Sequence, residues 1–340
     1  MSGTRMQAEM AEQPQVLAAL AERRHTLAGQ LRGLVTEPPT GIVLLARGSS
    51  DHAAVYGRYV LELALGRPVA LAAPSLHTLY GAKVDYSGYL AIAISQSGRT
   101  PEIATVLDAV RGAGAVGVAI TNEADSPLAQ AADGVIDLQA GNEVAVPATK
   151  TFTAQVAAFA LLAEALAPVP WADGDWDRLP DAVADVLADP QPADRAAEGI
   201  GDAPAMVVVG RGFCYGIALE VALKLKETCG LLAQGYSAAD LRHGPIAVVE
   251  DASPVLALVT SGPTEPDMRD LVEVMRGRGA NVHTAGTVDG ADMGVTTGIA
   301  EALATIPLAV RGQQVARALA LWRGLDPDQP KGLTKVTPTT

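Results

Sequence analysis

The 340-residue sequence has few aromatic residues, only two cysteines and no hydrophobic run long enough for a membrane span. Phe, Trp and Tyr together make up 4% of the chain, so we expect a core built from Ala, Val, Leu and Ile. The longest apolar stretch, about residues 156–167, contains Glu164 and is shorter than the ~20 residues that cross a bilayer. It therefore predicts a buried helix, and no membrane is expected as a partner.

Other absences restrict the function. The formal net charge is −13 and the chain has no long basic run, which argues against nucleic acid as a partner. Cys214 and Cys229 lie in apolar surroundings and form no disulfide framework, which indicates a reducing, cytoplasmic compartment. Glu9 and Glu12 do not fit a signal peptide. No His, Cys and carboxylate cluster has metal-ligand spacing, so we expect neither a metal nor another cofactor.

The chain contains one pattern twice. The tripeptide 46–48 (Ala-Arg-Gly) returns as 210–212 (Gly-Arg-Gly), and Ser97-Gly98 returns as Ser261-Gly262, each 164 positions later. Apolar runs typical of buried parallel strands precede these matches, and helix-length segments follow them. The expected strands are at 41–46, 90–94 and 116–120, then at 205–209, 254–259 and 281–285. The duplication predicts two α/β domains, each with a parallel sheet covered on both faces.

The same patterns set the expected boundaries. They predict an N-terminal helical segment at 1–34 broken near Pro14, a first domain at 35–168, a linker at 169–200 with a short helix at 179–188, a second domain at 201–325 and a tail at 326–340. The linker is rich in Asp and Pro. The tail has three prolines and little periodicity, so it is either a surface segment or a lid that folds over a site.

Two hydroxyl-rich loops follow strands of the first domain. Residues 95–100 (Ser-Gln-Ser-Gly-Arg-Thr) precede a helix that starts near Pro101, and Gly48-Ser49-Ser50 ends a neighbouring strand. A helix N-terminus presents N–H groups and a favourable dipole to an anion. The alternative is an ordinary turn capped by Ser or Thr. The second repeat has Phe213, Cys214 and Pro263 instead, so only the first domain is expected to bind phosphate.

A charged stripe marks the second domain. Glu220, Lys224 and Glu227 are spaced i, i+4, i+7 on an otherwise apolar helix, so they share one face. Such spacing usually marks a solvent-exposed salt-bridged stripe, but an enclosed carboxylate beside a lysine is suited to proton transfer. His243, in a loop, and Lys335, in the tail, are further candidates, although both positions are typical of ordinary surface residues.

The motifs around these residues resemble a known family. Residues 95–100, 143–152, 220–227, 236–245 and 328–337 are similar to the isomerase half of the glucosamine–fructose-6-phosphate aminotransferases, and residues 6–14 resemble the start of that half. The resemblance runs nearly end to end and places the chain with the sugar isomerase (SIS) family. It implies two flavodoxin-like domains, each with a five-stranded parallel sheet, and a homodimer that shares its active sites.

The resemblance also implies roles for single residues. Glu227 would move a proton between C1 and C2, His243 of the neighbouring subunit would open the sugar ring, and Lys335 would form a Schiff base with a ketose. Glu220 and Lys224 would support them. The sugar phosphate would be held by Ser49, Ser50, Ser95, Gln96, Ser97 and Thr100. Gly48, Val146 and Ala148 would line the pocket.

The sequence departs from the family pattern in ways that bear on specificity. Arg99, Asp240 and Ala148 replace an acid, a glutamate and a serine, and no glutaminase domain is recognised, which favours the ammonia-releasing direction. The predicted reaction converts glucosamine 6-phosphate and water to fructose 6-phosphate and ammonia. The alternatives are a fructosamine-6-phosphate deglycase, a related ketose/aldose phosphate isomerase, and a non-catalytic sugar-phosphate sensor.

Overall fold

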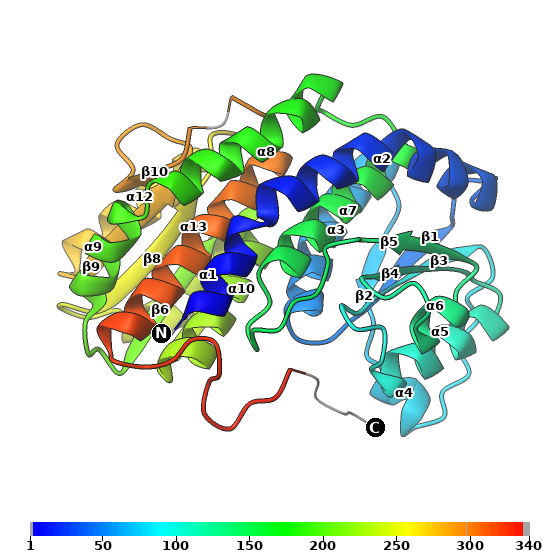
Figure 1. The fold of residues 1–340 in the computed structure, drawn as a ribbon, viewed down its shortest axis with the longest axis horizontal. Coiled ribbons are helices and arrows are strands. Elements are labelled where there is room, and N and C mark those ends of the chain that lie inside the picture. The colour runs from blue at the N-terminus through cyan, green and yellow to red at the C-terminus, as the bar shows by residue number, and fades with distance from the viewer. Residues whose placement is uncertain (1–2, 297, 336–340) are drawn as a thin grey trace. The chain divides into compact units, whose positions relative to one another are not determined.

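The computed structural model describes residues 3–296 and 298–335, which divide into two compact units. The first-repeat unit comprises Val16–Glu143 and Lys150–Ala172. The second-repeat unit comprises residues 3–15, Val144–Thr149 and Asp173–Lys335. Each unit contains one sheet with helices on both of its faces (Figure 1).

The first-repeat sheet has five parallel strands in the order β2-β1-β3-β4-β5. Helices α5 and α6 cover one face, where Val43, Ala91 and Ala119 join a buried cluster, and α3 and α7 contact the opposite face. The strands are β1 (Gly41–Leu45), β2 (Val69–Leu71), β3 (Tyr89–Ile94), β4 (Val116–Thr121) and β5 (Gly134–Asp137). The helices are α3 (Ser49–Leu65), α4 (Ser75–Thr78), α5 (Pro101–Gly112), α6 (Pro127–Gln130) and α7 (Lys150–Leu166).

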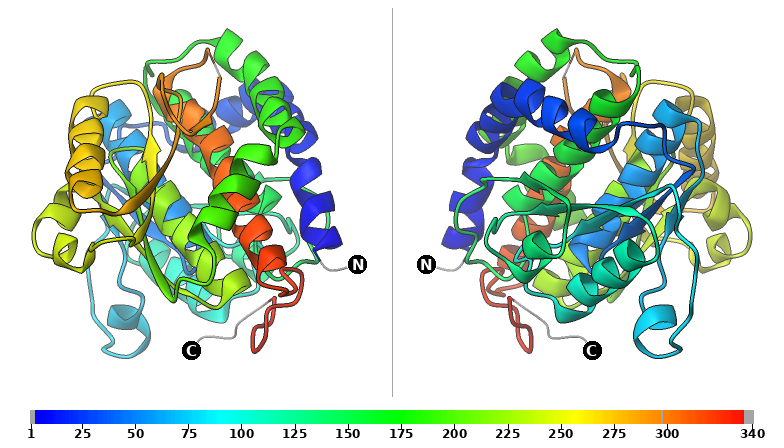
Figure 2. Two further views of the ribbon diagram at one scale, coloured as in Figure 1. Left: turned by 90° about the vertical axis from the view of Figure 1, so that its left-hand side faces the viewer. Right: turned by 90° about the vertical axis from the view of Figure 1, so that its right-hand side faces the viewer.

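The second-repeat sheet has the same strand order, β7-β6-β8-β9-β10, and is also parallel throughout. Helices α11 and α12 lie on one face, and α9, α10 and α13 on the other (Figure 2). The strands are β6 (Ala205–Gly210), β7 (Leu232–Ser237), β8 (Pro254–Val259), β9 (Asn281–Gly286) and β10 (Met293–Gly294). The helices are α9 (Gln191–Ile200), α10 (Cys214–Cys229), α11 (Ala238–Arg242), η1 (Pro245–Val248), α12 (Glu265–Gly277) and α13 (Glu301–Trp322).

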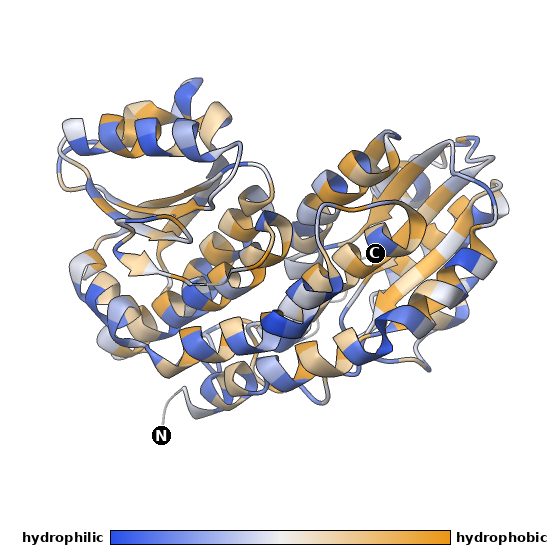
Figure 3. Ribbon diagram, turned by 90° about the horizontal axis from the view of Figure 1, so that it is seen from above, coloured by the Kyte–Doolittle hydropathy of each residue, from blue (hydrophilic) through white to orange (hydrophobic). Residues whose placement is uncertain are grey.

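These two sheets confirm the predicted α/β class with two five-stranded parallel sheets. Both have apolar central strands, because helices cover the two faces (Figure 3). The structure adds strands at the sheet edges, β2, β5, β7 and β10, which the apolar runs do not predict. None of the described helices is both long and apolar enough to cross a membrane.

The repeats also match in local geometry. Gly48 and Gly212 both lie in the loop after the first strand of their repeat (β1 and β6) with a φ of 59°, a left-handed conformation that favours glycine. Arg47 forms a two-pronged ion pair with Glu102, with both N–O distances 2.9 Å. At the equivalent place in the second repeat, Arg211 lies 2.8 Å from Asp267. The duplicated sequence therefore builds the same turn and the same ion pair twice.

The helix crossings in the two units use opposite arrangements of small and large residues. In the first-repeat unit, Gly57 of α3 packs against the ring of Phe159 of α7, so that a Cβ at position 57 would clash. In the second-repeat unit, Val221 of α10 occupies the position equivalent to Gly57, and it packs against Gly312 of α13. The close approach is kept while the glycine changes helix.

The segments outside the sheets are largely helical. The chain starts with α1 (Thr4–Ala11) and α2 (Gln13–Leu34), which are separated just before Pro14 as expected. The predicted short helix at 179–188 was too short: α8 (Asp173–Ala188) starts six residues earlier, and α9 follows it. Asp173 and Asp175 lie in the first turn of α8, where their negative charges interact favourably with the helix dipole. Trp176 of the same helix is fully buried.

Candidate active site

The two hydroxyl-rich loops of the first-repeat unit lie at the carboxyl ends of neighbouring strands. Gly48-Ser49-Ser50 follows β1 and residues 95–100 follow β3, and β1 pairs directly with β3. The connection from β1 leads to β2 on one side, whereas that from β3 leads to β4 on the other. Such a switch point opens a crevice at the carboxyl edge, where doubly wound sheets bind ligands.

The hydroxyl groups in the second of these loops do not serve as ordinary helix caps. Thr100 is the N-cap residue of α5, but its side chain makes no capping hydrogen bond. Its Oγ1 lies instead 3.4 Å from Ser95 Oγ. Ser97 Oγ accepts a hydrogen bond of 3.2 Å from the N–H of Arg99, so the hydroxyl hydrogen of Ser97 is left to donate elsewhere.

The backbone holds this loop tightly. Gly98 has a φ of 58° and packs against Ser126, so that a side chain at position 98 would clash. The N–H of Leu128 donates to the carbonyl of Gly98 (3.1 Å), and the N–H of Asn122 donates to that of Gln96 (3.1 Å). The loop is thus fixed by the segment that follows β4, with Ser97 and Thr100 partly exposed.

The first loop contains a contact that the sequence did not predict. Ser50 is buried at the start of α3, and its Oγ accepts a hydrogen bond of 3.1 Å from Nε2 of Gln155 on α7. Gln155 is 1% exposed, and it is an amide in the otherwise apolar stretch 154–163 of α7. That mismatch was the signal available in the sequence. Ser49 precedes Ser50 and is half-buried.

The charged side chains on α10 of the second-repeat unit form one compact cluster. Lys224 Nζ lies 2.6 Å from Glu227 Oε2 and 3.3 Å from Glu220 Oε1. The side chains of Lys224 and Glu220 are 1% and 2% exposed, and that of Glu227 is 20% exposed. The stripe is therefore buried rather than a solvated surface stripe, and Glu227 is its most accessible member.

The cluster keeps its lysine charged. Burial alone would lower the pKa of Lys224, but the adjacent Glu220 and Glu227 outweigh that effect and raise the pKa above its usual value. An ammonium so placed orients the Glu227 carboxylate and attracts negative charge that develops beside it. A carboxylate that is held in position and partly exposed is suited to general acid–base chemistry.

The loop Val144–Thr149 and the tail meet in the second-repeat unit. Lys335 Nζ donates to the carbonyl of Ala145 (2.8 Å), and the N–H of Val146 donates to the carbonyl of Asp328 (3.2 Å). Val146 and Ala148 are half-buried in this loop. The part of the predicted lid at 326–335 is therefore held in place, whereas 336–340 lies outside the described residues.

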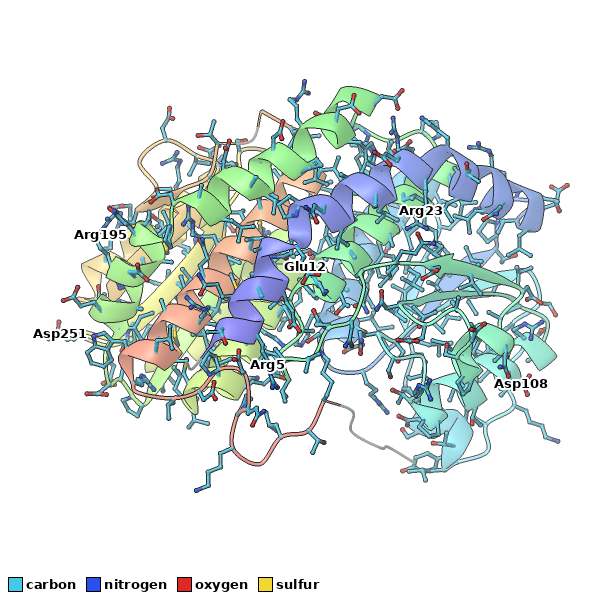
Figure 4. The ribbon with its side chains drawn as sticks, in the orientation of Figure 1. Arg5, Glu12, Arg23, Asp108, Arg195 and Asp251 are labelled. Carbon is cyan, nitrogen blue, oxygen red and sulfur yellow. The ribbon has the colours of Figure 1, made fainter. Side chains whose placement is uncertain are left out.

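Two carboxylates that the sequence did not single out fix this arrangement. Asp328 accepts hydrogen bonds from the N–H groups of Met6 (2.8 Å) and Arg5 (3.1 Å), and so caps α1. Figure 4 labels Arg5 on this helix. Glu9, one turn further along α1, accepts from the N–H groups of Val144 and Ala145. Helix α1 thus joins the tail to the loop that Lys335 contacts.

His243 lies at the C-terminal end of α11 and is exposed, like Asp240 in the same helix. Its Nδ1 is 2.8 Å from the carbonyl of Ala239. Because a carbonyl oxygen only accepts, the ring donates from Nδ1, and Nε2 is the basic nitrogen of the neutral ring. Arg99, in the other unit, is also exposed.

The second-repeat unit fills its own equivalent of the hydroxyl loop with a carboxylate. Glu301, the first residue of α13, accepts hydrogen bonds from Thr260 (2.9 Å) and Thr264 (3.5 Å), and its carboxylate packs against Gly262. Burial raises the pKa of Glu301, while the two threonine hydroxyls lower it in part. A loop of this shape therefore accommodates a carboxylate oxygen.

Metal-binding groups and reactive thiols are the remaining candidates for chemistry. Within residues 3–296 and 298–335, no group of three or more His, Cys, Asp or Glu side chains is placed to hold a metal ion. Cys214 and Cys229 are both buried and unbridged. Burial raises the pKa of the Cys214 thiol to about 12 and that of Cys229 to about 11.

Comparison with known proteins agrees with this geometry. The SIS domain family matches residues 39–165 and 200–285, which contain the first sheet, the second sheet except β10, and both sets of loops. The chain belongs to the SIS domain family. This SIS chain is similar to a glutamine–fructose-6-phosphate aminotransferase (isomerizing) of Methanothermobacter thermautotrophicus, with 34% identity over 305 residues. The aligned region covers 86% of this chain and 51% of that relative. The chain thus spans about half the length of the relative.

Solved structures match the SIS chain more completely. A protein of Silicibacter pomeroyi assigned as a phosphosugar isomerase is 32% identical, with a TM-score of 0.87, over 96% of this chain and 100% of that one. The C-terminal domain of glucosamine-fructose-6-phosphate aminotransferase from Francisella tularensis is 24% identical, with a TM-score of 0.86, over 96% and 98%. The second likeness shows the shared fold.

Proposed function

We propose that this SIS protein is an amino-sugar-phosphate isomerase and deaminase that converts glucosamine 6-phosphate and water to fructose 6-phosphate and ammonia. The observation that carries the proposal is the buried cluster of Glu220, Lys224 and Glu227, in which the Glu227 side chain stays 20% exposed. The relative of Methanothermobacter thermautotrophicus is named as an isomerizing aminotransferase, and the Silicibacter pomeroyi protein as a phosphosugar isomerase. Both names agree with chemistry at C1 and C2 of a phosphorylated sugar.

In the proposed reaction, Glu227 takes the proton from C2 of the open-chain sugar and returns it to C1, which turns the aldehyde and amine into a ketose imine. Lys335 then attacks the imine carbon, ammonia leaves, and water hydrolyses the lysine Schiff base to fructose 6-phosphate. An amine of this kind is a common nucleophile toward C=N and C=O groups. The hydroxyls of Ser95, Ser97 and Thr100, with Ser49, Ser50 and Gln96, hold the phosphate.

We further propose that the active species is a homodimer in which His243 of one subunit opens the sugar ring in the site of the other. The exposed ring with a basic Nε2 supports this role. Mixing a His243→Ala chain with a Glu227→Gln chain should restore about a quarter to a half of the sites, by counting over two-fold shared sites. No recovery in a confirmed mixed dimer would show that each site is built from one chain.

Ammonia release from a panel of amino-sugar phosphates tests the reaction. Release from glucosamine 6-phosphate, with fructose 6-phosphate as co-product, is the expected result. Borohydride added with fructose 6-phosphate should also trap an adduct on Lys335, visible by mass spectrometry. Release from fructosamine 6-phosphate alone would indicate the deglycase. If the protein bound the sugar phosphates but released no ammonia, interconverted no aldose and ketose and formed no adduct, it would be a sensor and not an enzyme.

A further inference from the structure

The buried amide of Gln155 points to a role beyond packing. Helix α7 buries 15 of its 17 residues, and Gln155 is 1% exposed among them. Its Nε2 donates to Ser50 Oγ at 3.1 Å, but its Oε1 has no hydrogen-bond partner among the described residues. A buried amide with an unsatisfied oxygen costs stability, so its presence in this helix calls for a compensating function.

The second repeat lacks this polar pair. The Gly57–Phe159 crossing corresponds to the Val221–Gly312 crossing, which aligns α3 with α10 and α7 with α13. On that alignment Cys214 replaces Ser50 and Leu308 replaces Gln155, and both replacements are buried. The amide therefore accompanies the serine loop and is absent from the repeat that lacks one.

The direction of the Gln155–Ser50 hydrogen bond determines whether the Ser50 hydroxyl can donate to an anion. A serine hydroxyl has one hydrogen to donate and two lone pairs that accept. Because the Gln155 N–H occupies a lone pair of Ser50, the hydroxyl hydrogen is directed away from the amide. A hydroxyl that donates stabilises a phosphate oxygen, whereas one that presents lone pairs repels it.

We propose that Gln155 is a positioning residue that fixes the Ser50 hydroxyl as a donor to the phosphate of the bound sugar; this rests on the proposed function. Gln155 itself does not touch the ligand. Gln155 therefore changes the affinity only by orienting the Ser50 hydroxyl. A residue that only packs α7 against α3 would not depend on Ser50 in this way.

A double-mutant cycle on fructose 6-phosphate binding tests the proposal by calorimetry. Gln155→Met keeps the side-chain length and removes the donor, so affinity should fall by about 2- to 12-fold, the range for one net hydrogen bond. In a Ser50→Ala background the same substitution should have no further effect on affinity. Gln155→Glu presents an acceptor to Ser50 and reverses its polarity, so we expect a larger loss than with Gln155→Met.

The control is Gln314→Met, which removes another buried glutamine, on α13, that bonds Arg311 and the carbonyl of Val186. It should lower the melting temperature without changing affinity. Equal losses from Gln155→Met in both backgrounds, or no loss in a folded variant while Ser50→Ala weakens binding, would overturn the role of Gln155 alone. If the unmodified protein bound neither fructose 6-phosphate nor glucosamine 6-phosphate, the proposed function and this inference would both fall.

Discussion

The two repeats share a scaffold but carry different chemical groups. Both have the same strand order, the same left-handed glycine and the same arginine–carboxylate pair. In the first-repeat unit the loop after β3 carries hydroxyls, and the buried face of the helix after β1 has no charged side chain. In the second-repeat unit the loop after β8 holds the carboxylate of Glu301, and the helix after β6 carries the buried charges.

The contrast is sharpest between α3 and α10. At the positions equivalent to Glu220, Lys224 and Glu227, helix α3 has Tyr56, Val60 and Leu63. Tyr56 and Val60 are buried apolar residues, so α3 has no counterpart of the charged cluster. Under the proposed function, the first-repeat unit binds the anion and the second-repeat unit moves the proton. Four experiments test that division, from the largest expected effect to the smallest.

Glu227→Gln should remove the proton-transfer group while keeping its shape and its hydrogen bond to Lys224. We expect kcat to fall by about 10²- to 10⁴-fold, the usual contribution of a general acid–base group, with fructose 6-phosphate binding retained. Steady-state ammonia release and calorimetry provide the two values. Glu273→Gln, at an exposed position on α12, is the matched control. Full turnover in Glu227→Gln would show that the cluster on α10 is structural.

Lys224→Met should destabilise the second-repeat unit, because it leaves the buried Glu220 carboxylate and the partly buried Glu227 without their cation. Breaking a buried pair in this way typically costs about 3–5 kcal/mol, measured as the loss in the free energy of unfolding by urea. Adding Glu220→Gln and Glu227→Gln should restore much of that loss. The control is Lys226→Met, which removes an exposed lysine of the same helix and should hardly change the free energy of unfolding. A similarly small effect from Lys224→Met would contradict the electrostatic account.

Removing hydroxyls from equivalent loops of the two repeats compares them directly. Ser97→Ala with Thr100→Ala should weaken sugar-phosphate binding, since each hydrogen bond to a charged group contributes about 1.5–3 kcal/mol. Ser261→Ala with Thr264→Ala makes the same change in the second repeat and should leave the Michaelis constant unchanged. Equal losses from both pairs would mean that both loops bind the phosphate. No loss from either pair would place the phosphate elsewhere.

The pH dependence of stability should reveal the internal carboxylate. Because burial raises the pKa of Glu301 above its ordinary 4.5, the folded state binds this proton more tightly than the unfolded state does. The resulting stabilisation is present below pH 4.5 and is lost as pH rises through the raised folded-state pKa. The free energy of unfolding of the unmodified protein should therefore fall relative to that of Glu301→Gln over this range. A constant difference between the two would show that Glu301 is not desolvated.

Much of the fold could be predicted because the central strands are buried on both faces. The runs at 41–46, 90–94, 254–259 and 281–285 coincide with β1, β3, β8 and β9 to within a residue at either end. Edge strands gave no such signal: β2 has three residues, two of them exposed, and β10 has two residues. The helical character of 173–200 was missed because its acidic residues and prolines are also typical of linkers.

For the candidate site, sequence spacing predicted the cluster on α10 but could not show whether it is buried. That depends on the elements packed around the helix, which are distant in sequence. The same limit applies to Gln155, Glu301 and Asp328. Each acts on a partner more than 30 residues away, so neither local periodicity nor local motif could identify its role. The roles of Glu227, His243 and Lys335 in the reaction remain predictions that rest on the family resemblance.

The alternation of glycine between Gly57 and Gly312 has a consequence for protein engineering. A chimaera that put α13 in the place of α7 would set Gly312 opposite Gly57 and leave a void where two glycines face each other. The reverse exchange would force Phe159 against Val221, where no space exists. Helices can therefore be grafted between the repeats only as matched pairs, α3 with α7 or α10 with α13. The duplicated halves are no longer interchangeable parts, although their strand order is identical.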